Sequence, residues 1–179
     1  MLTYEYHLPF DRISTKFRGL TQSWALSGIT RASTGFPVTI HADGDNSLQG
    51  SVPNGVNNRS LDLPDMAPGP LNINGNPRNG QPYFNTALFS FNELGTPGSA
   101  SRRSFYGPGA LNFDMALLKT FRIHERITAQ FRLESFNTFN HAQFFGPAAV
   151  AGGIDDNFFG QVIKAAPPRL MQVALKLTF

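Results

Sequence analysis

The sequence contains no cysteine, and it has few charged side chains for its length of 179 residues. Without cysteine, disulfide bonds and thiolate-bound metals are excluded. Asp, Glu, Lys and Arg make up 15% of the chain, whereas about 25% is usual for a soluble domain. The net charge of +3 comes from basic residues spread along the chain. We therefore expect no nucleic-acid partner, because binding one needs a clustered basic patch.

Long apolar runs are also missing. No segment reaches the roughly 18–20 apolar residues that a membrane-spanning helix needs. A closed β-barrel is the other structure that satisfies the backbone in lipid. Residues 1–7 show no basic region followed by an apolar core, so we expect no signal peptide in this chain. An outer-membrane location would then imply that the chain is a truncated part of a longer protein.

A regular alternation of apolar and polar side chains is present, most clearly over residues 169–179. The alternation ends on an aromatic residue, as is typical of the final strand of outer-membrane barrels. We predict that this strand closes a barrel and is read by the barrel-assembly machinery, and that its apolar face meets outer-membrane lipid. An edge strand of a soluble domain is the alternative. The apolar face consists of Met171, Val173, Leu175, Leu177 and Phe179.

The same alternation predicts an all-β, antiparallel up-and-down meander of about five strands. Five is fewer than the eight strands of the smallest barrels. The whole chain, 1–179, is therefore expected to be an unclosed segment of a large transmembrane barrel. Its open edges and apolar face predict that the chain alone aggregates or binds detergent. The strands are expected at about 2–10, 21–40, 110–123, 127–139 and 169–179.

The two faces of these strands differ in chemistry. The apolar face is predicted to contact lipid, and the polar face is predicted to line the lumen. The Arg132 and Glu134 pair has a second reading, an internal salt bridge without a channel role. Predicted lipid-facing residues, besides those of the last strand, are Tyr4, Tyr6, Leu8, Phe10, Trp24, Phe113, Leu117, Phe121, Ile127, Phe131 and Leu133. Predicted lumen-lining residues are Asp114, Arg122, Gln130, Arg132 and Glu134.

Short and long connections alternate along the chain. The long ones, 41–108 and 141–167, are expected to be extracellular loops, and the short ones, 11–20 and 124–126, periplasmic turns. The 41–108 loop, rich in Pro, Gly and Asn, is expected to have no structure of its own. A three-residue turn at 124–126 is predicted because it lets the two isoleucines beside it face each other.

Motifs for catalysis or cofactor binding are not found. The sequence has no phosphate-binding loop, no nucleophile elbow and no paired acid and base, so we expect neither an enzyme nor a cofactor. Asp43-Gly-Asp45-Asn-Ser47 has the opening spacing of a calcium loop. It lacks the later glycine and glutamate that such a loop requires, and we expect a solvated turn rather than a metal site.

Several motifs, in order along the chain, resemble the C-terminal end of TonB-dependent outer-membrane receptors of the Oar-like kind, which carry a carboxypeptidase-regulatory-like domain at their N-terminus. The resemblance covers nearly the whole chain and is densest from Tyr83 onward. The motifs are Trp24-Ala-Leu-Ser-Gly-Ile29, Ser33-Thr-Gly-Phe-Pro-Val-Thr39, Tyr83-Phe-Asn-Thr-Ala87, Gly107-Pro-Gly109, Asn112-Phe-Asp114, Lys119-Thr-Phe-Arg122, Phe131-Arg-Leu-Glu-Ser-Phe-Asn-Thr-Phe-Asn-His141 and 169–179.

The resemblance implies a 22-stranded barrel around a plug domain, with uptake of a scarce ligand driven by a periplasmic energy-coupling protein. This chain corresponds to about the last fifth of such a receptor, so the fragment alone is expected to be inactive. The ligand is not predicted, because plug and loops that recognise it lie largely outside this segment. Two alternatives stay open: a structural or surface-interaction segment of another outer-membrane barrel, and a soluble carbohydrate-binding β-sandwich.

Overall fold

The computed structural model describes residues 1–12, 17–50 and 62–179, and it divides into two compact units. Residues 51–61 of the expected 41–108 loop lie outside the described part. None of the described helices is long and apolar enough to span a membrane. The sheet unit comprises 1–33, 111–143 and 167–179, and the loop unit comprises 34–110 and 144–166.

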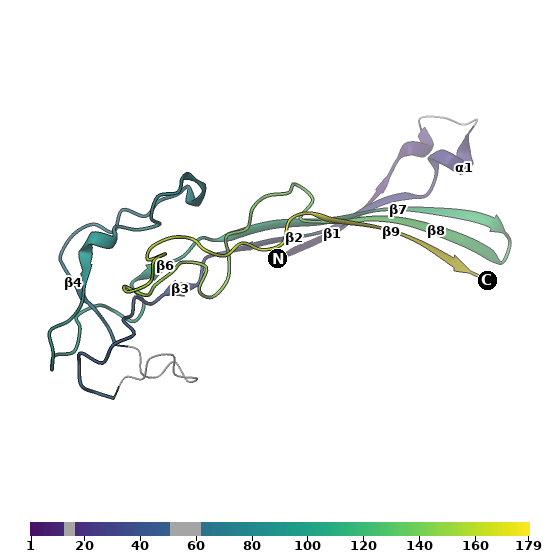
Figure 1. Cartoon of the computed structure of the whole chain (residues 1–179). Coiled ribbons are helices and arrows are strands. Elements are labelled where there is room, and N and C mark those ends of the chain that lie inside the picture. Colours follow the sequence, from purple (N-terminus) through teal and green to yellow (C-terminus); the bar gives the residue numbers. More distant parts are fainter. Residues whose placement is uncertain (13–16, 51–61) are drawn as a thin grey trace. The chain divides into compact units, whose positions relative to one another are not determined.

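The sheet unit is built on one five-stranded antiparallel sheet (Figure 1). The strands lie in chain order, so each is hydrogen-bonded to its sequence neighbours, and among the described strands β1 and β9 form the open edges. The predicted unclosed meander is confirmed. The five strands are β1 (Leu2–Leu8), β2 (Trp24–Ser33), β7 (Ala110–His124), β8 (Ile127–Phe136) and β9 (Leu170–Thr178).

The pairing register places the apolar side chains of the last three strands on one face. Leu133 of β8 pairs with Leu117 of β7 and with Val173 of β9. Directly paired residues point to the same side of a sheet. Because side chains alternate along each strand, Phe113, Leu117 and Phe121 of β7 share a face with Leu133 and Val173. Leu118 pairs with Arg132 and lies on the other face.

The first two predicted strands are longer than the observed ones. The first ends at Leu8, and Phe10 lies in the 3-10 helix η1 (Phe10–Arg12) rather than in the strand. The prediction for 21–40 is wrong beyond Ser33, where β2 ends. Alternation in the sequence continues past these points. Pro9, which cannot donate a ladder hydrogen bond, directly follows the end of the first strand, and Pro37 and Val38 pair outside the five-stranded sheet, with Tyr106 and Phe105.

The strand predicted for 127–139 ends at Phe136 because two asparagines turn the chain. Asn137 and Asn140 have positive φ angles of 50° and 49°, a conformation that asparagine tolerates better than most residues. The Asn137 side chain also accepts a hydrogen bond from the backbone N–H of His141 at 3.0 Å. The Phe-Asn-Thr-Phe-Asn stretch is therefore a turn and not a strand end.

The β7–β8 hairpin differs from the predicted three-residue turn. Its turn is Glu125–Arg126, and Ile127 pairs with His124 instead of Ile123. The register shifts between Arg122, which pairs with Thr128, and His124, so that Ile123 has no partner residue on β8. The prediction that Ile123 opposes Ile127 across a three-residue turn is therefore wrong, and the β-bulge is what keeps Leu117 paired with Leu133 although the turn is shorter.

The loop unit is not structureless, and that expectation is wrong. It contains two short antiparallel pairs and two 3-10 helices around a core of its own. The pairs are β3 (Pro37–Val38) with β6 (Phe105–Tyr106) and β4 (Asp65–Met66) with β5 (Phe89–Ser90), and the helices are η2 (Pro77–Asn79) and η3 (Thr86–Leu88).

Phenylalanine rings hold the core of the loop unit together. The Phe84 ring centre lies 4.7 Å from that of Phe105, 5.6 Å from that of Phe89 and 5.5 Å from that of Phe159. Ile40 and Val150 are buried in the same cluster. The core therefore combines side chains from the connection between β2 and β7 with side chains from the connection between β8 and β9.

Candidate functional site

The apolar face of the last strand is open in the sheet unit. Every residue of β9 is exposed, and Leu175 retains 66% of its accessible surface. Phe179 follows the end of β9 and is also exposed. A continuous apolar surface of this kind marks contact with lipid or with another protein. The structure thus places Met171, Val173, Leu175 and Leu177 together, and their contact with lipid stays a prediction.

The same apolar face continues over β1 and β2. Tyr4, Tyr6 and Leu8 pair with Gly28, Leu26 and Trp24. The Tyr4 ring covers Gly28 so closely that an added Cβ would lie 2.6 Å from the ring. Aromatic cover of a strand glycine in this way supports an otherwise weak position. It supports the pairing of Trp24 to Thr30 of the Gly-containing β2 with β1.

Phe10 lies outside the strand but still contacts the apolar face. Its ring centre is 6.3 Å from that of Trp24, in an edge-on arrangement. Phe113, near the start of β7, packs edge-on against Phe139 at 5.1 Å. Phe121 lies on β7, and Ile127 and Phe131 lie on β8, within the strands predicted for them.

Lys119 is the one charged side chain on the apolar face of β7, and it is almost fully buried, with 2% of its surface exposed. Its ammonium group donates a hydrogen bond to the carbonyl oxygen of Gln22. The same group lies 5.6 Å from the Trp24 ring centre and 4.9 Å from that of Phe121. Cation–π contacts and a carbonyl acceptor replace the water that the charge would otherwise need.

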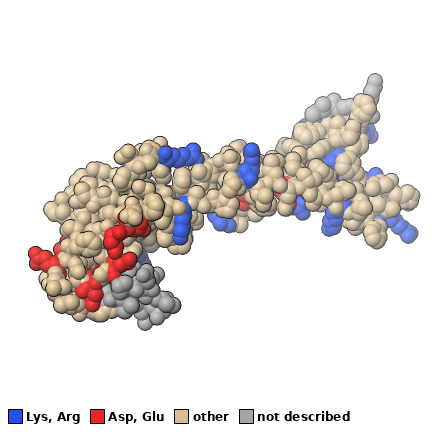
Figure 2. Space-filling model, in the orientation of Figure 1, with Lys and Arg blue, Asp and Glu red and all other residues tan. Residues whose placement is uncertain are grey.

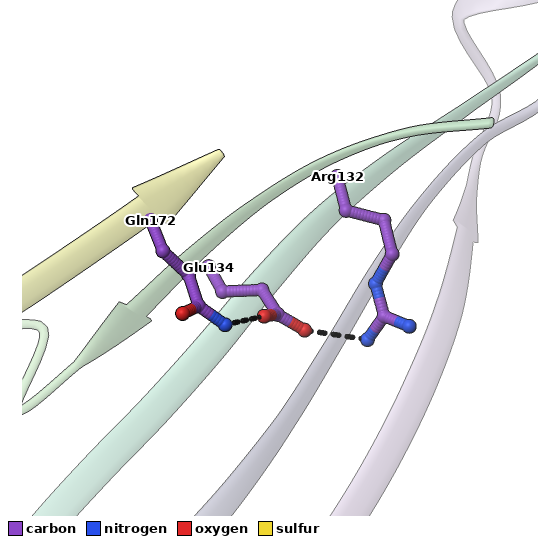
Figure 3. Close-up of polar contacts among 3 residues, drawn as sticks. All are labelled: Arg132, Glu134 and Gln172. Atoms are coloured by element: carbon purple, nitrogen blue, oxygen red, sulfur yellow. Dashed lines mark hydrogen bonds and ion pairs between the residues drawn. The ribbon is translucent and has the colours of Figure 1, made fainter. Parts of the chain in front are cut away.

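The polar face carries a connected group of side chains on β8 and β9 (Figure 3). Arg132 donates through Nη2 to Glu134 Oε1 at 2.5 Å. The other oxygen of Glu134 accepts a hydrogen bond from Gln172, which is its direct cross-strand partner. Sequence reasoning missed Gln172, because only the β8–β9 register brings it beside Glu134.

The predicted lumen-lining residues do not form one site. Asp114 accepts hydrogen bonds from Asn112 at 2.8 Å and from the backbone N–H of Asn137 at 2.9 Å, so its carboxylate fixes the turn after β8. Gln130 lies in register between Thr120 and Lys176, and Arg122 pairs with Thr128. A hollow of about 370 Å³ on this unit is lined in part by Glu5, Asp114, Arg132 and Glu134.

The two units differ in their balance of acidic and basic residues (Figure 2). The loop unit holds seven of the twelve Asp and Glu residues, whereas the sheet unit holds ten of the fifteen Lys and Arg residues. A hollow of about 920 Å³ in the loop unit is lined by polar groups, among them His41, Asp43, Arg102 and Asp156. Ligand pockets of small molecules have volumes of roughly 300–1,000 Å³.

Asp62 is the best-connected carboxylate of the loop unit. It accepts hydrogen bonds from the backbone N–H of Ser47 at 2.9 Å and from the Asn92 side chain at 3.2 Å. Burial alone would raise the pKa of Asp62, but these donors and the backbone of Leu63 outweigh it and hold the pKa below its usual value. Burial raises the pKa of the nearby core residue Tyr83.

The calcium-like stretch folds as a local turn. One oxygen of the Asp45 carboxylate accepts from the backbone N–H of Gln49, and the other accepts from that of Gly50, each at 3.0 Å. Within 1–12, 17–50 and 62–179, no group of three or more His, Asp or Glu side chains is arranged to hold a metal ion.

Comparison with known proteins gives one family. Residues 1–172 match the family described as the outer membrane beta barrel domain. The comparisons with curated proteins and with solved structures give no match. The matched region covers four of the five strands completely and the start of β9. The family and the sheet agree with each other, and the chain belongs to the outer membrane beta barrel domain family, whose place is the outer membrane.

Proposed function

We propose that this chain is the C-terminal barrel segment of a TonB-dependent receptor, and that the complete receptor takes up a ligand across the outer membrane. Uptake would depend on a plug domain within the barrel and on a periplasmic energy-coupling protein. The segment itself contributes the last strands, the closing edge and part of the outer loops. It performs no catalysis and needs no cofactor of its own.

The observation that carries the proposal is that the resemblance motifs contact one another in space. Asp114, from the Asn-Phe-Asp motif, accepts a hydrogen bond from Asn137 in the Ser-Phe-Asn-Thr-Phe-Asn motif. Residues 23 positions apart in the chain thus fix a single turn. A set of motifs that packs together supports common ancestry with the receptors more strongly than scattered short matches do.

A second pair of motifs meets in the loop unit. A Cβ placed on Gly35 would lie 1.8 Å from the carbonyl oxygen of Gly107, so the two backbones approach so closely that only glycine fits at position 35. Tyr83 and Phe84, from a third motif, are buried in the core of the same unit. Asn85 completes that motif by accepting a hydrogen bond from the backbone N–H of Ala87 at 3.2 Å.

The loop unit also favours a receptor over a barrel with a purely structural role. A folded unit with a polar hollow of about 920 Å³ has the size of a ligand site. A structural barrel needs no such unit. The soluble β-sandwich does not agree with the family assignment, nor with a single sheet whose apolar face is open.

The coding sequence upstream of Met1 tests the proposal directly. A receptor requires an in-frame signal peptide, a coupling motif, a plug domain and the missing strands. An upstream frame that encodes barrel strands without a plug would refute uptake and favour the structural alternative. Where a plug is present, the complete protein in detergent should bind the C-terminal domain of the energy-coupling protein, and deletion of the coupling motif should abolish binding.

A further inference from the structure

The connection between β1 and β2 presents two large apolar side chains to the outside. It contains η1 and the short helix α1 (Arg18–Thr21). Phe17 and Leu20 each keep 65% of their surface exposed. Neither belongs to the apolar face of the strands, because both lie in the connection itself. Their exposure therefore needs an explanation separate from the lipid contact predicted for the sheet.

Several hydrogen bonds hold this connection in place. Trp24 donates through Nε1 to the carbonyl oxygen of Leu20 at 2.7 Å. The next carbonyl but one, that of Gln22, accepts from the buried Lys119 ammonium group. A turn tied at two successive points to β2 and β7 cannot easily fold its apolar residues inward. The hydrogen bonds at Leu20 and Gln22 therefore help to keep Phe17 and Leu20 on the outside.

Basic side chains lie in the same connection as the two apolar ones. Arg12 and Arg18 are exposed. The bond from the Thr120 N–H to the Ser23 carbonyl oxygen, 3.1 Å long, places the end of β7 beside this connection. The β7–β8 turn therefore adds Arg126, which is also exposed, at the same end of the sheet.

We propose that this basic and apolar end of the sheet binds the anionic phospholipid headgroups of the inner leaflet of the outer membrane. Phe17 and Leu20 insert at the level of the headgroups, and Arg12 and Arg18 bind lipid phosphates. Exposed apolar side chains with arginines nearby are a combination that anchors a segment at an anionic lipid surface. We assign the lipids to the inner leaflet, because short connections of outer-membrane barrels face the periplasm. The proposal requires that the protein lies in the outer membrane, but it does not require that the protein takes up a ligand.

Trp24 makes the test local, because it is the only tryptophan in the chain and it contacts this connection directly. The chain 1–179 is inserted into vesicles of phosphatidylcholine with about 30% phosphatidylglycerol. Bromine is carried on the acyl chains of either one lipid or the other, and quenching of Trp24 fluorescence reports which lipid is near. Arg12→Gln/Arg18→Gln is compared with Arg102→Gln/Arg103→Gln, which removes the same charge from the loop unit.

The wild-type chain should be quenched by brominated phosphatidylglycerol more than its share of the lipid accounts for. Arg12→Gln/Arg18→Gln should lose this preference, by up to roughly fivefold for each arginine, as should the wild-type chain in about 1 M salt. The control variant should keep it. Phe17→Ser/Leu20→Ser should reduce quenching by both lipids. Quenching in proportion to lipid content, or a preference that survives loss of both arginines, would overturn the proposal and leave a periplasmic protein as the occupant.

Discussion

The ammonium group of Lys119 lies 5.6 Å from the centre of the Trp24 ring, although the two residues are 95 positions apart. Lys119 comes from β7 and Trp24 from the first position of β2. The contact joins the two strands at the end of the sheet where the chain reverses through α1. It also accounts for a charge that interrupts an otherwise apolar face.

Replacing Lys119 with methionine should destabilise the sheet unit. The variant keeps a side chain of similar length but loses the bond to the Gln22 carbonyl and both ring contacts. We expect a loss of about 1–3 kcal/mol, measured as urea unfolding of the micelle-bound chain by Trp24 fluorescence. Lys176→Met, at an exposed position of β9, is the matched control. Equal urea midpoints for the two variants would show that the contacts of Lys119 with the Gln22 carbonyl and the two rings do not stabilise the sheet unit.

Charges on adjacent positions of β9 should have opposite consequences. In the complete barrel, Leu175→Arg places a charge on the predicted lipid face, at a cost of about 2–4 kcal/mol near the bilayer centre. Ala174→Glu places a charge on the polar face, directly opposite Arg132, and should be tolerated because the two charges have opposite sign. Membrane levels of the folded protein measure the difference. Deletion of Phe179 should also lower these levels, and normal assembly of the Leu175→Arg and Phe179-deleted proteins would refute the role given to the strand.

Asp62→Asn should destabilise the loop unit by about 1–3 kcal/mol at neutral pH, since a carboxylate that accepts hydrogen bonds from buried donors is replaced. The lowered pKa of Asp62 gives the sign of the pH effect. Its contribution is complete above the unfolded value of about 3.9 and is lost as pH falls through the lower folded value.

Urea titrations followed by near-UV circular dichroism at several pH values test this point. The wild-type loop unit should lose stability below about pH 4, and the variant should lose less. Glu93→Gln, at an exposed position of the same unit, should behave as the wild type. A variant with unchanged stability at neutral pH would contradict the role of Asp62.

Gly35→Ala should disrupt the loop unit through its backbone. The new methyl group would lie 1.8 Å from the Gly107 carbonyl oxygen, so the two segments must separate, at a cost of about 1–3 kcal/mol or more. Gly75→Ala serves as the control, because a Cβ there meets nothing within 4 Å. The rate of protease cleavage in the 62–110 region should rise for the first variant alone. Similar cleavage of both variants would show that the close approach is unimportant.

The sidedness of the connections can be read by labelling intact cells that express the complete protein. An epitope inserted beside Asn76, an exposed residue of the loop unit, should be accessible from outside. One inserted at His124, beside the β7–β8 turn, should become accessible only after the outer membrane is permeabilised. The opposite pattern would reverse the topology and would also move the proposed lipid site to the outer surface.

The strands were predictable because alternate positions along each of them are mostly apolar. The alternation from Met171 to Leu177, or from Phe113 to Phe121, fixes both the strand and its face. The exact ends were less predictable. The alternation continues past Ser33, where β2 ends, and it does not reveal the bulge that shortens the turn after β7.

The loop unit was not predictable from local pattern. Its core joins Phe84 and Phe105 with Phe159, residues that no periodic pattern connects and that are drawn together only by the fold. Gln172 was missed for a similar reason, since its contact with Glu134 depends on the pairing of strands that 33 residues separate. Short turn signals describe where the chain bends, but they say nothing about which bends share a core.

The mixed origin of that core limits how the loops can be transplanted. Val150 and Phe159 belong to the connection after β8, yet they pack with Phe84 from the connection after β2. A graft of residues 34–110 alone onto another barrel would leave the apolar interior short of two side chains and open to water. For display of this surface on a carrier, both connections must therefore be moved together, and natural variants should change length in them as a pair.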